Sequence, residues 1–153
     1  MLRISRLTDY ATVILASLAG GGLASATDIA ARTHIGLPTV SKLLKELQHA
    51  GLVRSVRGAR GGYQLARAPA AISAAAIIDA VEGPVALTEC AGGAGNCGIE
   101  TTCLVGHGWQ RISRAIRRAL ADVSLDALVR RDATFATPDF SGPQPPDRAP
   151  ARG

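Results

Sequence analysis

The chain has 153 residues, of which 47% are hydrophobic and only 3% aromatic, and its formal net charge is +5. This length suits about one domain, and the scarcity of aromatic residues predicts a core of Leu, Ile, Val and Ala, which favours helices. No apolar stretch approaches the ~20 residues of a membrane span, so the composition argues against a membrane protein and predicts a cytoplasmic one whose thiols stay reduced.

The net positive charge is confined to the first half of the chain. Residues 1–67 contain nine Lys or Arg against three Asp or Glu, whereas residues 68–153 contain eight against nine. A surplus on one part of a chain indicates a polyanionic partner, and nucleic acid is the commonest one.

The first predicted helix lies within residues 4–18. Apolar side chains recur there at steps of three and four residues, which places them on one helical face. A run of three glycines at residues 20–22 ends the helix. We expect the buried face to consist of Ile4, Leu7, Ala11, Ile14, Leu15 and Leu18.

Two further helices are predicted with a short turn between them. Ser25 or Thr27 caps a short helix at residues 28–32. A turn at residues 33–37 leads into a third helix at residues 38–50, which opens on a proline, a residue that suits the first helical position. The buried stripe expected on this third helix is Val40, Leu43, Leu44 and Leu47.

A β-hairpin is predicted next. Residues 52–57 and 63–66 read as two short strands, and the glycine-rich residues 58–62 join them. A short helix, a tight turn, a second helix and a hairpin in this order are typical of a winged helix-turn-helix, which reads DNA. An ordinary helical core with a solvated basic face would explain the charge alone, but the order and spacing of the elements favour a DNA-binding module.

The candidate DNA contacts lie on the outer face of the third helix and on the hairpin. Short polar side chains can approach base edges, and lysines can reach phosphates or guanine edges. An arginine at the hairpin tip, flanked by small residues, can enter a minor groove. These candidates are Thr39, Ser41, Lys42, Lys45, Arg57 and Arg60.

A fourth helix is predicted at residues 73–81, and a glycine-rich loop at residues 89–103 follows it. This loop contains all three cysteines of the chain, Cys90, Cys97 and Cys103. An odd number of thiols makes a poor disulfide framework, whereas thiolates are ligands for iron–sulfur clusters and zinc. The spacings, with six and five intervening residues, are too long for a zinc knuckle, and glycines let a backbone curve around a bulky core. The loop therefore favours an iron–sulfur cluster.

Three thiolates leave one coordination position to be filled. His107 is the nearest nitrogen candidate, Glu89 and Glu100 are oxygen candidates, and the ligand could also come from another subunit. The alternatives are free thiols without a ligand, a zinc site made by three thiolates and one imidazole, and a metal-free disulfide switch. The close two-residue cysteine spacing of redox motifs is absent, which argues against the switch.

A long helix is predicted at residues 104–129. It carries an apolar stripe that is hard to bury within one small chain, so we expect it to form a dimer seam through Trp109, Ile112, Ile116, Leu120 and Val123. From residue 132 the chain is rich in Pro, Ala and Asp without periodicity and is expected to be disordered. The expected organisation is a winged helix-turn-helix at residues 1–67, a cluster-binding loop with a dimerisation helix at residues 68–131, and a tail at residues 132–153.

Three of these segments together resemble a known family. The sequence LTDYA at residues 7–11, the hairpin RGGYQLA at residues 60–66, and the cysteine loop with Trp109 six residues beyond Cys103 resemble the first helix, wing and cluster loop of the iron–sulfur cluster regulators. This family of dimeric winged-helix repressors includes IscR and NsrR. Residues 1–5 and 96–99 are most similar to regulators of the SUF cluster-assembly operon.

The resemblance implies a homodimer built on the long helix, with a cluster on each subunit near the dimer interface. In the histidine-ligated branch the histidine stands three residues after the last cysteine, where this chain has Gly106, and His107 follows. Relatives that sense nitric oxide use an acidic residue from the partner's first helix, a region that Asp9 matches. The fourth ligand is therefore His107 or Asp9 of the partner subunit, and the cluster is 2Fe-2S or 4Fe-4S.

The sequence as a whole predicts a mainly α winged-helix homodimer that binds double-stranded promoter DNA. We expect a repressor of SUF cluster-assembly genes that is controlled by an iron–sulfur cluster. The alternatives are a nitric-oxide-sensing repressor and a cluster carrier or scaffold, which would not need DNA. No acid pair, nucleophile–base set or phosphate loop stands out, so an enzyme is not expected.

Overall fold

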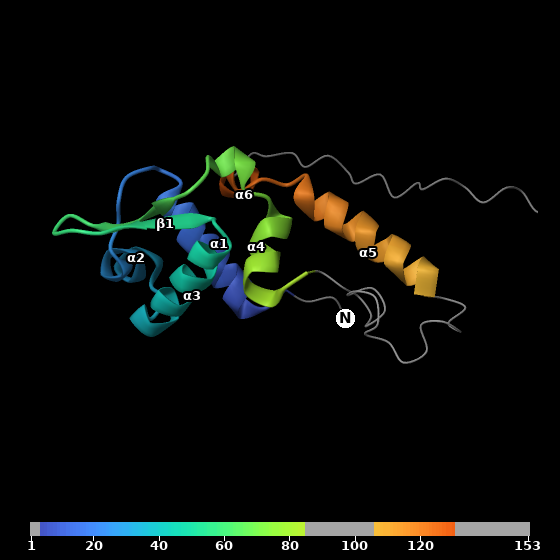
Figure 1. Ribbon diagram of the computed structural model, residues 1–153, viewed down its shortest axis with the longest axis horizontal. Helices are drawn as coiled ribbons and strands as arrows, with labels where there is room; N and C mark the ends of the chain where they lie inside the picture. The colour runs from blue at the N-terminus through green and yellow to red at the C-terminus, as the bar shows by residue number, and fades with distance from the viewer. Residues whose placement is uncertain (1–3, 85–105, 131–153) are drawn as a thin grey trace, which may run out of the picture.

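The computed structural model describes residues 4–84 and 106–130 (Figure 1). In these ranges the chain is mainly helical with one two-stranded antiparallel hairpin, as the sequence predicts. The elements in chain order are α1 (Arg6–Leu18), α2 (Ala26–Thr33), α3 (Leu37–His49), β1 (Val53–Val56), β2 (Gly62–Leu65), a 3-10 turn (Pro69–Ala71), α4 (Ala74–Glu82), α5 (Gly106–Ala121) and α6 (Leu125–Val129).

Serine side chains fix where the first helices begin. Ser5 caps α1, Ser25 caps α2 and Ser73 caps α4, each accepting a hydrogen bond from the backbone N–H three residues ahead. At α2 the bond is reciprocal, because Asp28 accepts from the backbone N–H of Ser25 and completes a capping box. Ser25, rather than Thr27, is therefore the cap of the second helix.

The core is aliphatic and lies between α1, α2, α3, α4 and the base of the hairpin. The predicted stripe of α3 is fully buried, and so are most of the predicted residues of α1. Ile4 and Leu7 were expected in the same face but are exposed. The reason is that α1 begins only at Arg6, so Ile4 precedes the helix, and at the first turn Thr8 takes the inward position instead.

The hairpin is anchored at its base by the connector between α1 and α2. Ala24 N–H donates to the Tyr63 carbonyl at 3.0 Å, and Tyr63 N–H donates to the Ala24 carbonyl at 2.8 Å. A Cβ at Gly62 would lie 2.7 Å from the Ala24 carbonyl oxygen, and a Cβ at Gly61 would overlap the Val56 carbonyl oxygen. Glycine is needed at both positions because neighbouring backbone occupies the space of a side chain.

The prediction of one long helix at residues 104–129 is wrong in one respect, because the described part of this range forms two helices. A break at residues 122–124 separates α5 from α6, and Ser124 caps α6. Around the break, Ala74 N–H donates to the Val123 carbonyl at 2.8 Å and Leu125 N–H donates to the Ile72 carbonyl at 2.7 Å. These two bonds to a distant segment take the place of helical bonds.

The described elements form a body, made of α1 to α4 and the hairpin, and an arm, which is α5. In Figure 1, α1 to α4 pack together, the hairpin projects from one end, and α5 extends away from the other end. The three cysteines and the predicted tail lie outside the described residues. Within residues 4–84 and 106–130, no helix combines the length and apolar character that crossing a membrane requires.

Candidate nucleic-acid interface

Helix α3 presents a sharply divided surface. Its apolar stripe is buried in the body, while Thr39 and Ser41 are half-buried and Lys42 and Lys45 are exposed. Before it, His34 ends α2 in the left-handed conformation (φ 57°), which turns the chain sharply into α3. A helix docked by one face, with short polar groups and lysines on the other, has the form that a DNA groove accepts.

The two lysines of α3 are available to an external anion. Lys42 Nζ lies 3.9 Å from Glu46 Oε1, but its side chain is 62% exposed. Such a surface pair contributes little, so phosphate can compete for the lysine. Lys45 is exposed and makes no ion pair with any other residue that the structure describes.

The hairpin adds a second basic element. Arg57 and Arg60 are exposed and lie between β1 and β2. The hairpin itself projects beyond the body (Figure 1). Arg54 is also exposed, on β1 and opposite Gln64 in the strand register. Arg54 was missed in the sequence analysis, although an arginine on a predicted strand of a wing was the available signal. The six predicted contact residues thus lie on two elements, α3 and the hairpin. These two elements are in contact, because α3 packs against β1.

One acidic group near the interface has a structural role. The Ser25 hydroxyl and backbone N–H both donate to the Asp28 carboxylate. These bonds lower the pKa of Asp28 below its ordinary value, and Arg32 adds a smaller effect in the same direction. Asp28 is therefore committed to the N-terminus of α2.

The candidate cluster ligands are only partly described. Cys90, Cys97 and Cys103 lie outside the described residues, as do Glu89 and Glu100. His107 is exposed in the first turn of α5, and Asp9 is exposed on α1. Among the described residues, no group of three or more His, Cys, Asp or Glu side chains could hold a metal ion. The assignment of His107 or Asp9 as a ligand beside the thiolates therefore stays a prediction.

Glu82, the last residue of α4, binds the start of α1 and precedes the segment that holds the cysteines. Its Oε1 accepts a hydrogen bond from the Ser5 backbone N–H at 3.1 Å and a short one from the Thr8 hydroxyl. The Thr8 bond is the main cause that lowers the pKa of Glu82 below its ordinary value. The contact joins the end of α4 to the start of α1, one residue before Asp9. Sequence reasoning missed it because the partners are more than 70 residues apart.

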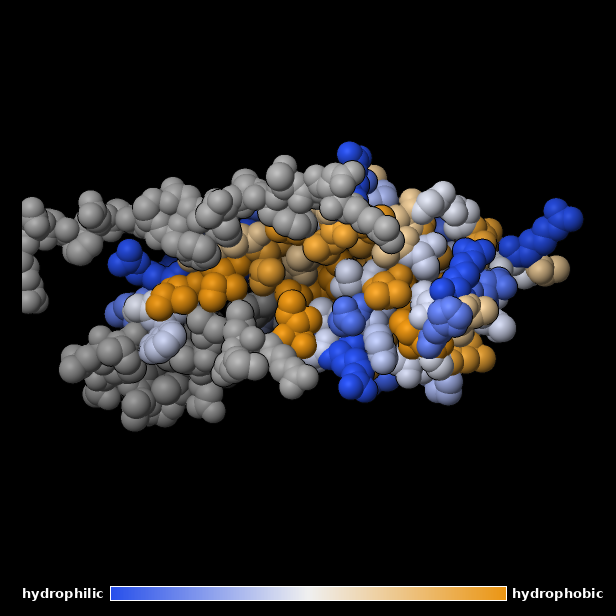
Figure 2. Space-filling model, turned by 180° about the vertical axis from the view of Figure 1, so that it is seen from behind, coloured by the Kyte–Doolittle hydropathy of each residue, from blue (hydrophilic) through white to orange (hydrophobic). Residues whose placement is uncertain are grey.

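The predicted dimer stripe leaves much apolar surface uncovered. Trp109 and Ile112 are 42% and 47% exposed, whereas Ile116, Leu120 and Val123 are half-buried. Figure 2 shows hydrophobic side chains gathered in a band that runs from the α5 end toward the middle of the molecule. A groove of about 390 Å³ continues the band, lined by Ile4, Thr8, Asp9, Thr12, Ala74, Ile77, Ile78, Leu120, Val123 and Leu128.

Comparisons with known proteins bear on the family and the fold of the chain. Residues 4–131 match the family Rrf2, described as an iron-dependent transcriptional regulator. The chain is 38% identical over 133 residues to a candidate helix-turn-helix transcriptional regulator of Azotobacter vinelandii, ORF2, covering 85% of this chain and 80% of that protein.

Two solved structures show the same fold. CymR, the global cysteine regulator of B. subtilis, is 34% identical with a TM-score of 0.64, and the match covers 84% of this chain and 97% of that one. IscR of T. potens is 30% identical with a TM-score of 0.62, and the match covers 84% and 86% of the two chains. These structures share the winged helix-turn-helix fold.

Proposed function

This chain belongs to the Rrf2 family of transcriptional regulators, and we propose that it is a homodimeric repressor whose affinity for promoter DNA is controlled by an iron–sulfur cluster. Membership makes it a DNA-binding regulator and not an enzyme. The cofactor, the repressing role, the dimer and the target genes are the proposal. A protein that acts on promoters works where the DNA is, so we propose the cytoplasm as its location.

The observation that supports the DNA contacts is the divided surface of α3. Lys42 and Lys45 face solvent on the helix that the body holds by its apolar side, and Arg57 and Arg60 extend the basic surface along the hairpin. We assign phosphate or guanine contacts to the lysines, base-edge contacts to Thr39 and Ser41, and groove contacts to the arginines. Each lysine that neutralises a phosphate contributes about one unit to the salt dependence of binding.

The test of these contacts is the salt dependence of affinity for duplex DNA. Lys45→Gln should weaken binding to every sequence and reduce the slope of log K against log salt by about one. Arg60→Ala should reduce discrimination between sequences instead. Arg118→Gln, which removes a charge from the exposed face of α5, is the control and should change neither. Unchanged binding in both Lys45→Gln and Arg60→Ala would contradict the assignment of α3 and the hairpin.

The donor set fits an iron–sulfur cluster. Cys90, Cys97 and Cys103 offer three soft thiolates, and either His107 or Asp9 of the partner subunit offers the fourth ligand. The His107 and Asp9 side chains are both exposed, so either is accessible for binding a cluster. When bound, the cluster would supply a group that oxygen, nitric oxide or iron shortage can alter. Either a 2Fe-2S or a 4Fe-4S cluster suits three thiolates and one further ligand.

The dimer is proposed from the exposed stripe of α5. Trp109 and Ile112 leave apolar surface in solvent next to half-buried Ile116, Leu120 and Val123. An apolar band of this kind on a folded chain marks an interaction surface, and a second copy supplies a matching one. The SUF cluster-assembly genes are proposed as targets from the resemblance of residues 1–5 and 96–99 to SUF regulators.

A nitric-oxide-sensing repressor is the second candidate. It is favoured by Asp9, which is exposed and lines the same groove as Leu120 and Val123, next to the proposed dimer surface. The two candidates differ in their signal. Loss of DNA binding on exposure to nitric oxide, with binding retained under iron limitation, would favour this candidate over control of SUF genes by cluster supply.

Anaerobic purification tests the cofactor directly. We expect a coloured protein with iron and sulfide bound, and an affinity for promoter fragments that changes when the cluster is removed. Cys97→Ser should abolish the visible absorption, and a comparison of His107→Ala with Asp9→Ala should identify the fourth ligand. Arg118→Gln is again a suitable control. A colourless oxygen-free preparation whose DNA affinity is unaffected by reconstitution with iron and sulfide would overturn the proposal.

A further inference from the structure

Helix α5 packs against α4, and two sets of polar contacts join it to the body. At its C-terminal end, the two backbone bonds around Val123 and Leu125 pair the chain with residues 72–74. Nearer its middle, Arg117 reaches across to Asp79 of α4. Toward the N-terminus, Trp109 and Ile112 are exposed. These polar contacts lie in the C-terminal part of α5, and the helix extends from there away from the body (Figure 1).

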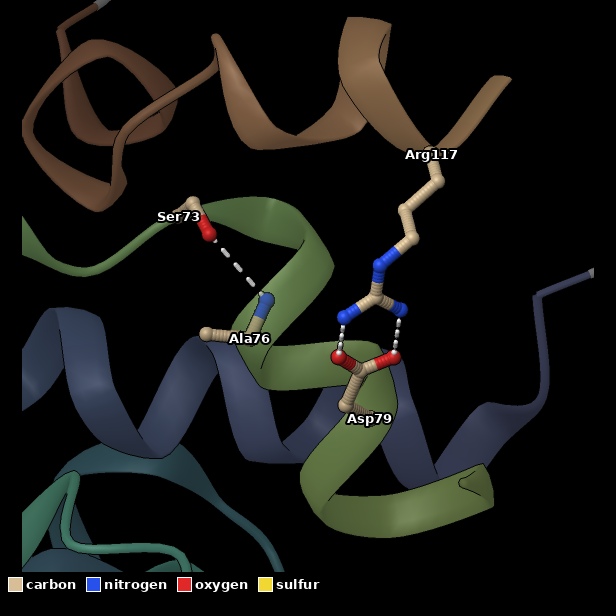
Figure 3. Close-up of polar contacts among 4 residues, drawn as sticks. All are labelled: Ser73, Ala76, Asp79 and Arg117. Atoms are coloured by element: carbon tan, nitrogen blue, oxygen red, sulfur yellow. Dashed lines mark hydrogen bonds and ion pairs between the residues drawn. The ribbon is translucent and has the colours of Figure 1, made fainter. Parts of the chain in front are cut away.

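The Arg117–Asp79 contact is a two-point clamp. Arg117 Nη1 donates to Asp79 Oδ1 at 2.7 Å, and Nη2 donates to Oδ2 at 2.5 Å, so the planar guanidinium faces the carboxylate edge to edge (Figure 3). The contact raises the pKa of Arg117 above its ordinary value through hydrogen bonding and charge attraction. A bidentate pair restricts orientation as well as distance, which a single lysine contact would not do.

Most of α5 lies on the N-terminal side of the clamp, so its direction depends on the angle at the clamp. Gly106 precedes Arg117 by eleven residues, which at about 1.5 Å per residue is roughly 16 Å of helix. A tilt of about 10° at the clamp would move the far end by ~3 Å. One base-pair step along DNA is about 3.4 Å. In a dimer joined through α5, a tilt at the clamp would shift the two DNA-binding bodies relative to each other, and a shift of a few ångströms is comparable with one such step.

Helix α4, which carries Asp79, connects the clamp to α3, the helix proposed to contact DNA. Asp79 lies on α4, and α4 packs against both α1 and α3. Ser73 fixes the start of α4 by accepting from the Ala76 N–H at 3.2 Å (Figure 3). The position of α3 relative to α5 is therefore transmitted through α4.

We propose that the Arg117–Asp79 ion pair is a positioning contact that fixes the tilt of α5 against the DNA-binding body and thereby sets the spacing between the two half-sites of the operator. The inference rests on the proposed dimer through α5, because half-site spacing in such regulators follows from dimer geometry. Neither residue contacts DNA in this assignment. Both act through the geometry of α4 and α5.

A purely stabilising role would leave a different signature. The Arg117 and Asp79 side chains are 45% and 26% exposed, and ion pairs at such surface positions contribute little to stability. Such a pair could be lost with a small drop in melting temperature and no change in the DNA sequences that are bound. The spacing of selected operators therefore separates positioning from stability.

The experiment is selection of bound duplexes from a random-sequence DNA library with purified full-length holoprotein. Wild type should enrich an inverted repeat with one dominant spacing. Arg117→Gln should enrich the same half-site sequence with two or more spacings, and should bind the wild-type repeat about fivefold more weakly. Arg118→Gln removes the same charge one residue on, from an exposed arginine with no ion pair among the described residues, and should keep the wild-type spacing.

Further variants keep the test decisive. The exchange Asp79→Arg with Arg117→Asp should restore a single spacing, because it reverses the pair without removing it. If Arg117→Gln does not fold, Asp79→Asn carries the comparison. A single wild-type spacing in folded Arg117→Gln or Asp79→Asn would overturn the inference. A wild-type protein that enriches no inverted repeat would instead count against the proposed dimeric repressor itself.

Discussion

The body and the arm of this chain place their apolar residues in opposite ways. In α1 to α3, the large apolar side chains of the core have almost no solvent exposure, and those of α3 form an unbroken buried stripe. In α5, a similarly spaced stripe begins with Trp109 and Ile112 exposed to solvent. The core of the body is closed within one chain, whereas the apolar stripe of α5 is the surface that we propose for dimerisation.

The largest effect that would sharpen this contrast is a truncation in the body. Leu44 is fully buried on the inner face of α3. Leu44→Ala should lower the free energy of unfolding by ~3 kcal/mol, because it removes buried surface and leaves a cavity. Chemical denaturation monitored by circular dichroism measures the change. Val13→Ala, at an exposed position of α1, should cost well under ~1 kcal/mol. Equal losses would contradict a body that carries its own stability.

A charge on the arm should have the next largest effect, and of a different kind. Ile112→Asp should give monomers that bind inverted-repeat DNA roughly ten- to a hundredfold more weakly, about 1.4–2.8 kcal/mol, because an unpaired carboxylate would be buried in the dimer seam. The unfolding of the isolated chain should change little, since Ile112 is exposed. Sedimentation and fluorescence anisotropy measure the two quantities.

The matched control for Ile112→Asp lies on the body. Leu23, in the connector between α1 and α2, is exposed to a similar degree. Leu23→Asp should leave both the dimer and DNA binding intact. An Ile112→Asp protein that remains a dimer would move the seam away from α5 and remove the contrast between the two regions.

The same contrast explains what the sequence could predict. In the body, local signals decide most of the structure: Ser25 and Ser73 begin helices, and the spacing of Val40, Leu43 and Leu47 identifies the buried face of α3. The periodicity rule fails only at the N-terminus, where Ile4 and Leu7 fit the period but lie at or before the first turn and are exposed.

The arm shows why the remainder could not be predicted. The break after α5 depends on backbone bonds between the segment around Val123 and a segment about 50 residues earlier, and the period of apolar residues is blind to such bonds. The pairing of Arg117 with Asp79 is non-local in the same way. For the candidate site, side-chain type predicted the lysines of α3, which the structure places at exposed positions, and the cysteine ligands lie outside the described residues; both assignments stay predictions.

The smallest effect concerns the contact that closes the body beside the segment leading to the arm. Glu82 accepts bonds from Ser5 and Thr8, and the Thr8 bond holds its pKa below the ordinary value of 4.5. A lowered pKa means that the folded state binds the proton less tightly than the unfolded state. The stabilisation is therefore fully present above pH 4.5 and is lost as the pH falls through the lower folded-state pKa.

Glu82→Gln should accordingly lower the melting temperature slightly at neutral pH, by the equivalent of ~0.5 kcal/mol, because an exposed carboxylate contact is screened by solvent. The difference from wild type should shrink as the pH falls through the lowered folded-state pKa, because the protonated wild-type carboxyl group then resembles the amide. Asp122→Asn, which changes an exposed carboxylate at the break after α5, provides the control. A difference independent of pH would mean that Glu82 contributes through packing, and that its charge does not hold the start of α1 to the end of α4.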